Sequence, residues 1–301
     1  MTAQEDVPIG KIVALLIVGL ITFGLAPILV RFATDVEPMA LAALRTGFAV
    51  LCLLPFWIPK RTSLSVLKEN GVSHILLALA GISLGLHFSF WIASLHYTSV
   101  ASASVLVTMH PVMLIVAERL IFSKKFKLII WVGVIISFSG SVLLGVADDT
   151  SLEAFPNALL GNTFAFTAAV IFVVYFMLGR KIRQYTEWID YVFYVYLYAT
   201  ITCTVLVVFW VGGIPAMSGT ALLVGFALAA GPTILGHGSM NYAVKYVSPT
   251  LLSTLVLSEA IFAAIAAYFI FSEVPTLFSL SAMVVIMIGV SLTWYKRVKK
   301  A

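Results

Sequence analysis

Four ionisable side chains interrupt stretches of the chain that are otherwise apolar, namely His87, His110, His237 and Glu259. An ionisable group costs about 2.5–3.5 kcal/mol at the centre of a bilayer, so such residues tend to face a bundle interior or a wet cavity. The pattern predicts a polar site within a membrane protein, with Glu259 as the candidate for proton coupling. In the simpler alternative, each histidine only hydrogen-bonds a neighbouring helix and fixes packing.

Aromatic side chains accompany these groups. Trp91 lies about one helical turn after His87, and Tyr97 and Tyr242 flank the apolar stretches that carry the histidines. Aromatic walls with few charges suit a small amphipathic or aromatic solute. Trp91, Tyr97 and Tyr242 are therefore candidates to line the same site, the alternative being that they only pack between helices.

Arg45 is the one basic residue well inside an apolar stretch, about two turns from its outer end. A long side chain at that depth is expected to extend toward the interface or to pair with Asp35 or Glu37. In the functional alternative Arg45 binds an anionic group at the outer mouth of the site.

The elements that must position these residues follow from composition. The 301 residues are 61% hydrophobic and 10% charged, whereas globular chains are about 45–50% apolar and about 25% charged. A spanning helix needs about 20 apolar residues. Ten stretches qualify, so the expected fold is an all-α polytopic membrane protein with ten transmembrane helices: 12–30, 39–58, 75–95, 100–122, 128–146, 159–178, 191–211, 221–243, 251–271 and 277–295.

Prolines and glycines within these stretches predict where helices kink and where they pack closely. Pro27, Pro111 and Pro232 are expected to kink their helices and to free backbone carbonyls. Gly81 and Gly85, spaced four residues apart, are expected to allow a close helix contact.

The connections between stretches divide the charges by sign. With this assignment, all but Arg31 and Arg45 of the 18 Lys and Arg residues fall on one side of the membrane. Because basic residues are enriched in cytoplasmic loops, both termini are expected in the cytoplasm, with the chain in the inner membrane. A basic inner surface also explains the net charge of +5 without nucleic acid as a partner.

The chain resembles itself when it is shifted by 149 residues. Tyr97-Thr98-Ser99 falls on Tyr246-Val247-Ser248, and Ile121-Phe122-Ser123 falls on Ile270-Phe271-Ser272. His110 falls on Glu259. Two repeats follow, residues 1–147 and 158–301. Each holds five stretches, an odd number, so the repeats are expected to cross the membrane in opposite senses, as in many secondary transporters that work by alternating access.

Several strings resemble the drug/metabolite transporter superfamily, specifically the EamA-type exporters. They are Pro38-Met39-Ala40 followed by Arg45, residues 97–103 (YTSVASA), Pro111-Val112, residues 236–243 (GHGSMNYA), and Ser258-Glu259-Ala260 followed by Phe271-Ser272-Glu273. The resemblance covers essentially the whole chain and implies export of a small solute. Two positions depart from the family pattern. Ser123-Lys124 replaces an acidic residue at the end of the fourth stretch, with Glu118 earlier, and Ala260 replaces a proline.

The expected function is therefore secondary transport of a small metabolite, amino acid or drug-like compound, without enzymatic activity and without a cofactor. A nucleotide-sugar or sugar-phosphate antiporter is one alternative, although it needs more Lys or Arg at mid-depth than Arg45 alone. An intramembrane metal-binding protein or metalloenzyme, with a site of three histidines and Glu259, is another, although the residues lack metal-motif spacing. The expected partners are a solute and the lipid bilayer, and a homodimer is left open.

Overall fold

The structure of the chain is a computed structural model that describes residues 9–33, 35–98, 103, 106–148, 156–272 and 274–295. Every regular element in this part is a helix, and the elements are α1 (Ile9–Arg31), α2 (Pro38–Trp57), α3 (Leu64–Glu69), α4 (His74–Tyr97), α6 (His110–Ile121), α7 (Leu128–Asp148), α8 (Ala158–Ile182), α9 (Trp188–Val211), α10 (Gly219–Leu228), η1 (Ala229–His237), α11 (Gly238–Ala243), α12 (Pro249–Val256), α13 (Glu259–Phe271) and α14 (Leu277–Trp294).

Within the described residues, eight helical segments are long and apolar enough to cross a membrane, and 128–143 forms a shorter apolar helix. A multi-pass helical membrane protein is therefore confirmed, as expected where the bilayer offers no hydrogen bonds to an open backbone. The expected stretches 100–122 and 251–271 differ from continuous helices. Among the described residues of the first, Leu106 and Val107 are helical and a turn at Thr108 and Met109 precedes the helix that begins at His110. Leu257 and Ser258 interrupt the second.

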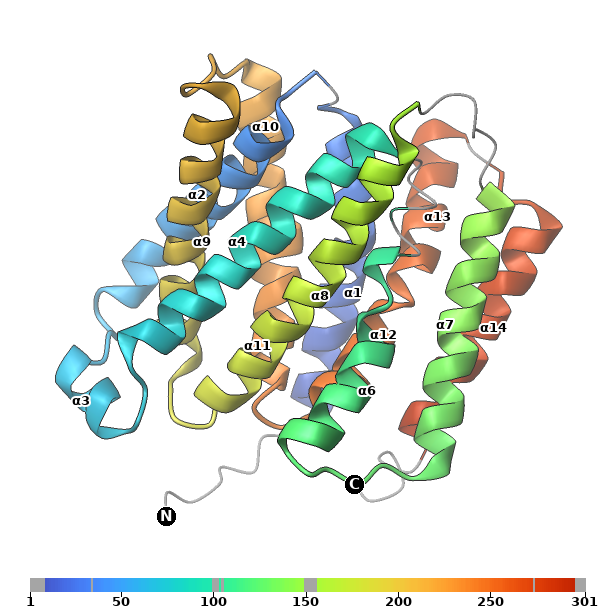
Figure 1. Ribbon diagram of the computed structural model, residues 1–301, viewed down its shortest axis with the longest axis horizontal. Coiled ribbons are helices and arrows are strands. Elements are labelled where there is room, and N and C mark those ends of the chain that lie inside the picture. The colour runs from blue at the N-terminus through green and yellow to red at the C-terminus, as the bar shows by residue number, and fades with distance from the viewer. Residues whose placement is uncertain are drawn as a thin grey trace.

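Pairs of packed helices in the two repeats correspond to each other under the 149-residue shift. α4 packs against α8, and α1 packs against η1 and α11. The shift carries residues of α1 onto α8 and residues of α4 onto the segment from α10 to α11, so the two contacts correspond. α2 packs against α9, and α7 pairs with α14 at one side of the bundle (Figure 1).

Glycines permit the closest of these contacts. A Cβ on Gly85 would lie 2.8 Å from the Ala199 carbonyl oxygen, which confirms the predicted close contact of this helix. A Cβ on Gly133 of α7 would lie 2.7 Å from the Gly289 carbonyl oxygen of α14. Real Cβ atoms do not approach backbone this closely, so both helix pairs depend on glycine.

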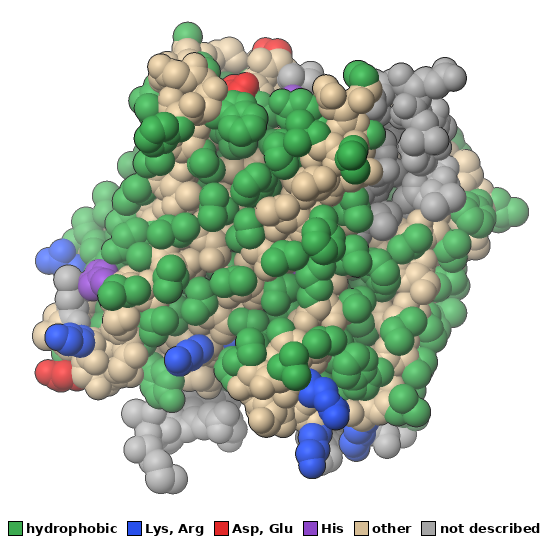
Figure 2. All heavy atoms as spheres, viewed as in Figure 1, with side chains coloured by type: hydrophobic (Ala, Val, Ile, Leu, Met, Phe, Trp, Pro, Cys, Tyr) green, Lys and Arg blue, Asp and Glu red, His purple; other side chains and the backbone are tan. Residues whose placement is uncertain are grey.

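One end of the bundle, which we call the basic end, carries most of the visible positive charge. α1 begins and α14 ends there (Figure 1). On the face drawn in Figure 2, Lys and Arg side chains lie over the lower half and most acidic side chains lie near the top. Two contacts join elements at this end: Lys11 lies over the ring of Tyr242, and Trp294 donates to the Leu251 carbonyl.

Candidate functional site

Three of the predicted site residues come together inside the bundle. His87 of α4, His110 of α6 and His237 of η1 are all buried. The ring of Phe172 on α8 lies among them, with centroid distances of 5.0 Å to His87, 4.7 Å to His110 and 6.3 Å to His237. We call these four side chains the histidine cluster.

Other aromatic rings enclose the histidine cluster. The imidazole of His237 meets the rings of Phe23 and Phe88 edge to face, at 4.8 and 4.9 Å. Tyr175 lies 6.3 Å from the same imidazole. α1, α4, α6, α8 and η1 therefore all contribute to one buried, mostly aromatic site.

The hydrogen bonds of the histidines define which nitrogens are available. Nδ1 of His87 lies 2.9 Å from the Ala168 carbonyl oxygen. A carbonyl can only accept, so Nδ1 carries the proton and Nε2 of neutral His87 is an acceptor. Nδ1 of His110 is buried without a hydrogen-bond partner in the described part of the chain. Such an orphaned polar atom needs a water or a ligand to satisfy it.

Arg45 lies beside the histidine cluster. Its side chain is 1% exposed, its Nε donates to Thr233 Oγ1 at 3.0 Å, and its Cζ lies 3.8 Å from the ring centroid of Phe88. The expectation that Arg45 extends outward or pairs with Asp35 or Glu37 was wrong. The inward orientation arises because Thr233 and Phe88 supply an acceptor and an aromatic face within the bundle.

Thr233, which accepts the hydrogen bond from Arg45, lies in η1, a helix that is wider than an α-helix. Thr233 follows Pro232, which cannot donate the backbone hydrogen bond that a regular α-helix requires. The segment adopts π-helical geometry, and Thr233 Oγ1 donates to the Leu228 carbonyl at 2.9 Å. Tyr196 in turn donates to the Thr233 carbonyl at 2.8 Å. π-helical turns are frequent at functional sites.

The two interrupted spans break in the same way. In the first repeat Met109 N donates to Leu106 O at 3.3 Å, and Val112 N donates to Met109 O at 3.1 Å. In the second, Ser258 N donates to Leu255 O at 3.0 Å, and Ile261 N donates to Ser258 O at 3.1 Å. The 149-residue shift superposes both bonds. His110 and Glu259 thus each begin the helix that follows a tight turn.

The chemical causes of the two breaks differ. Pro111 occupies the first turn of α6, where its missing N–H costs nothing, and it cannot donate the backbone hydrogen bond that would continue a preceding helix. In the second repeat Ala260 replaces the proline, and the Ser258 hydroxyl instead donates to the Leu255 carbonyl at 2.6 Å. A serine that competes for backbone carbonyls in this way bends a helix.

Glu259 is not in contact with the histidines. Its side chain is half-buried, and it makes no hydrogen bond or ion pair with another described residue. Its helix α13 packs against α1, where a Cβ on Gly24 would lie 2.8 Å from the Ala263 nitrogen.

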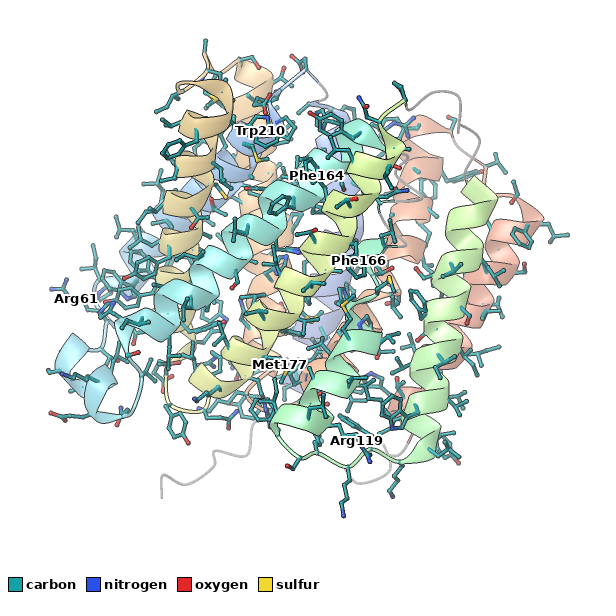
Figure 3. All side chains as sticks on the ribbon, in the orientation of Figure 1. Arg61, Arg119, Phe164, Phe166, Met177 and Trp210 are labelled. Atoms are coloured by element: carbon teal, nitrogen blue, oxygen red, sulfur yellow. The ribbon has the colours of Figure 1, made fainter. Side chains whose placement is uncertain are left out.

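The aromatic candidates lie outside the histidine cluster. Trp91 is partly buried in the core and makes no ring contact with a histidine. Tyr97 packs on Phe164 at 5.9 Å, and Phe164 lies near Trp210 at the end away from the basic end (Figure 3). Tyr242 packs on Tyr246 at 5.7 Å at the basic end.

A buried polar network that sequence reasoning missed lies between the histidine cluster and the basic end. Tyr175 donates to Asn241 Oδ1 at 2.6 Å, and Arg183 Nε donates to the Asn241 carbonyl at 2.9 Å. Nδ2 of Asn241 and the hydroxyl of Tyr191 are buried without partners in the described chain. Burial lowers the pKa of the Arg183 guanidinium from its ordinary value. Asn241 was detectable as the amide within the eighth apolar stretch.

Phe172 and Thr233 were also missed. Phe172 carries no signal in a sequence that is already rich in aromatic residues, whereas Thr233 was detectable as a hydroxyl next to Pro232 within a span. Among the described residues, no three His, Cys, Asp or Glu side chains are grouped so that they could hold a metal ion. Chemically, the site can offer imidazole nitrogens, one guanidinium and aromatic faces to a solute.

Comparison with family models identifies the family. The chain matches the EamA-like transporter family twice, over residues 10–146 and over residues 159–295. A crystal structure shares its fold with a TM-score of 0.79 at 16% sequence identity, over 97% of this chain and 99% of that chain. A search of curated proteins found no match. Because the family match covers nearly the whole chain in two copies, the chain belongs to the EamA-like transporter family.

Proposed function

We propose that the chain is a secondary transporter that moves a small solute across the cytoplasmic membrane by alternating access around the histidine cluster. The supporting observation is the pair of equivalent tight turns before His110 and Glu259. Interrupted helices at corresponding positions of two repeats are typical of transporter sites, because the unwound turns present polar groups near mid-membrane.

The proposed architecture has ten spans in two inverted halves, residues 1–147 and 158–301, with both termini in the cytoplasm. The exchange of helix contacts by the 149-residue shift supports the inverted halves. The gathering of Lys and Arg at the basic end supports its cytoplasmic placement (Figure 2). Membership in a transporter family favours transport over an enzymatic role.

The proposed solute is amphipathic and carries an anionic group. Phe23, Phe88 and Phe172 offer apolar ring faces around the histidines. Arg45 offers its remaining guanidinium N–H groups, since it makes only one hydrogen bond and no ion pair among the described residues. Guanidinium groups bind carboxylate and phosphate with paired hydrogen bonds. The buried charge of Arg45 therefore also keeps a sugar-phosphate antiporter as a second candidate.

Proton coupling through Glu259 is part of the proposal. Glu259 occupies the position equivalent to His110, which belongs to the histidine cluster, and it is free of hydrogen bonds and ion pairs in the described chain. A carboxyl group without a fixed partner is available to bind and release a proton as its surroundings change. Export is the proposed direction, as expected for EamA-type exporters.

Solute counterflow in proteoliposomes tests the proposal. Candidate amino acids, aromatic acids and sugar phosphates are first ranked by their effect on the thermal unfolding of the purified protein. We expect saturable counterflow of the stabilising solute, and at least a tenfold loss in His237→Ala. His74→Ala is the matched control. His74 is the first residue of α4, and it contacts Tyr198 away from the histidine cluster. Equal counterflow in the two variants would contradict a site at the histidine cluster.

A further inference from the structure

Helices α6 and α12 pack against each other (Figure 1), and one carboxylate forms a hydrogen bond across this contact toward the basic end. Glu118 of α6 is 1% exposed, and its Oε2 accepts the backbone N–H of Thr250 at 2.8 Å. Its Oε1 accepts from the ammonium of Lys124 at 3.1 Å. Thr250 lies in the first turn of α12, where N–H groups have no partner within the helix and the helix dipole favours an anion.

Only one of these two bonds joins the repeats. Lys124 follows α6 in the same repeat, so the ion pair with Glu118 stays intact if α6 moves as a unit. Thr250 belongs to the second repeat, so its bond to Glu118 must break if the interrupted spans separate at the basic end. Hydrogen bonds to charged groups are stronger than neutral ones, and a buried carboxylate loses more than a neutral group when its partner leaves.

The carboxylate of Glu118 has no counterpart at the equivalent position of the other repeat. The shift that superposes His110 on Glu259 places Ala267 on Glu118. In a transporter built from inverted repeats, the state closed at the opposite end uses the equivalent surfaces of the two repeats. That state therefore lacks a carboxylate at the position equivalent to Glu118.

We propose that Glu118 is a one-sided latch, which biases the resting transporter toward the conformation closed at its basic end. The proposal rests on alternating access as the proposed function. The latch joins α6 to α12, and His110 begins α6 about 12 Å along the helix axis from Glu118. Opening the basic end thus moves the same helix that carries a member of the histidine cluster.

The contact is also suited to reversible opening. The hydroxyls of Ser248 and Thr250 are buried beside it without hydrogen-bond partners in the described residues. Water that enters between the separated helices can satisfy both hydroxyls and the freed carboxylate, which offsets part of the cost of opening. The latch is therefore a polar contact that can be hydrated, unlike an apolar seal.

Distance measurements by pulsed electron paramagnetic resonance test the latch on the full-length protein. Spin labels are attached to Lys125→Cys and Lys245→Cys in a background without Cys52 and Cys203. Both label positions lie near the basic end, after α6 and before α12. We expect one main short-distance population in the otherwise unchanged protein. Glu118→Ala should raise the ratio of long to short distances about tenfold or more, the size expected for loss of hydrogen bonds to a buried charge.

Two further variants complete the test. Glu118→Gln keeps an oxygen acceptor without the charge and should give a smaller shift in the same direction, and it decides the matter if Glu118→Ala does not fold. Ala267→Glu adds a carboxylate to the other repeat and should also favour the long distance. Glu69→Ala, which removes an exposed carboxylate at the end of α3, should leave the distances unchanged.

The outcomes separate the latch from the transport proposal because the distances are measured without solute. Unchanged distances in both Glu118 variants would overturn the latch, and so would an equal shift in Glu69→Ala. A shifted distribution in a protein that transports no tested solute would support the latch and count only against the proposed solute classes.

Discussion

The guanidinium of Arg45 stacks on the ring of Phe88, with Cζ 3.8 Å from the ring centroid. The same ring meets the imidazole of His237 at 4.9 Å. One aromatic side chain therefore separates a buried positive charge from the histidine cluster. Arg45 makes no ion pair among the described residues, which supports the proposed anionic group of the solute as its counter-charge.

Substitution of Arg45 tests this assignment. Arg45→Lys keeps the charge but offers a point donor in place of a planar fork, so affinity for carboxylate or phosphate solutes should fall about tenfold or more. Arg45→Met should fold and lose the preference for anionic over neutral analogues. The measurement is the shift in thermal unfolding with anionic and neutral analogues. Lys68→Met is the control at an exposed position, and unchanged discrimination in Arg45→Met would refute the assignment.

Phe172 connects the histidines physically, so its loss should destabilise the fold. Phe172→Ala leaves a cavity among buried rings and is expected to cost about 3–5 kcal/mol. Phe166→Ala on the same helix, where the side chain is 43% exposed, should cost within about 0.5 kcal/mol (Figure 3). Thermal unfolding in one detergent compares the two. Equal losses of stability would show that the centre of the bundle does not depend on this ring.

Glu259→Gln tests proton coupling. The substitution keeps the size and a hydrogen-bonding group but removes the titratable proton. We expect solute counterflow to continue, because exchange needs no net proton movement, while solute-driven acidification of proteoliposomes disappears. Glu37→Gln is the control, because it removes a carboxylate at the start of α2 that has no proposed role in proton coupling. Proton flux that persists in Glu259→Gln would exclude this residue as the carrier.

The spans and their close contacts were predictable from sequence for physical reasons. A helix in lipid must be long and apolar, so α1, α2 and α4 begin and end within a few residues of the predicted bounds. Gly85 packs against α9 because a glycine in an apolar helix marks a surface where another backbone approaches. These features depend on length, composition and spacing, which one sequence contains.

The direction of individual side chains was less predictable. Arg45 turns inward because Thr233 and Phe88 lie next to it, and both come from distant parts of the chain. Tyr97 lies ten residues after His87 on α4, about 15 Å along the axis, so it cannot share a site at the depth of His87. No proline in the sequence predicts the turn before Glu259, because the bend there comes from the hydroxyl of Ser258. Such positions depend on three-dimensional neighbours.

The contact between α7 and α14 gives a prediction about stability alone. A Cβ on Gly289 would lie 2.6 Å from the Gly133 carbonyl oxygen, so Gly289→Ala must push the two helices apart. A Cβ on Gly10, within α1, would meet nothing within 4 Å. We expect a lower unfolding temperature for Gly289→Ala and an unchanged or higher one for Gly10→Ala, because alanine favours helix over glycine. Equal unfolding temperatures would contradict the close contact.

The proposed membrane orientation, with the basic end in the cytoplasm, has a direct test. Asp35 and Lys181 are exposed residues, before α2 and at the end of α8 respectively. In a background without native cysteines, Asp35→Cys should react with an impermeant maleimide in intact cells, and Lys181→Cys only after permeabilisation. The reason is that basic loops stay in the cytoplasm during insertion. Reversed labelling would invert the orientation. Labelling of both sites from outside would place the two ends of the bundle on one side of the membrane, which inverted repeats do not allow.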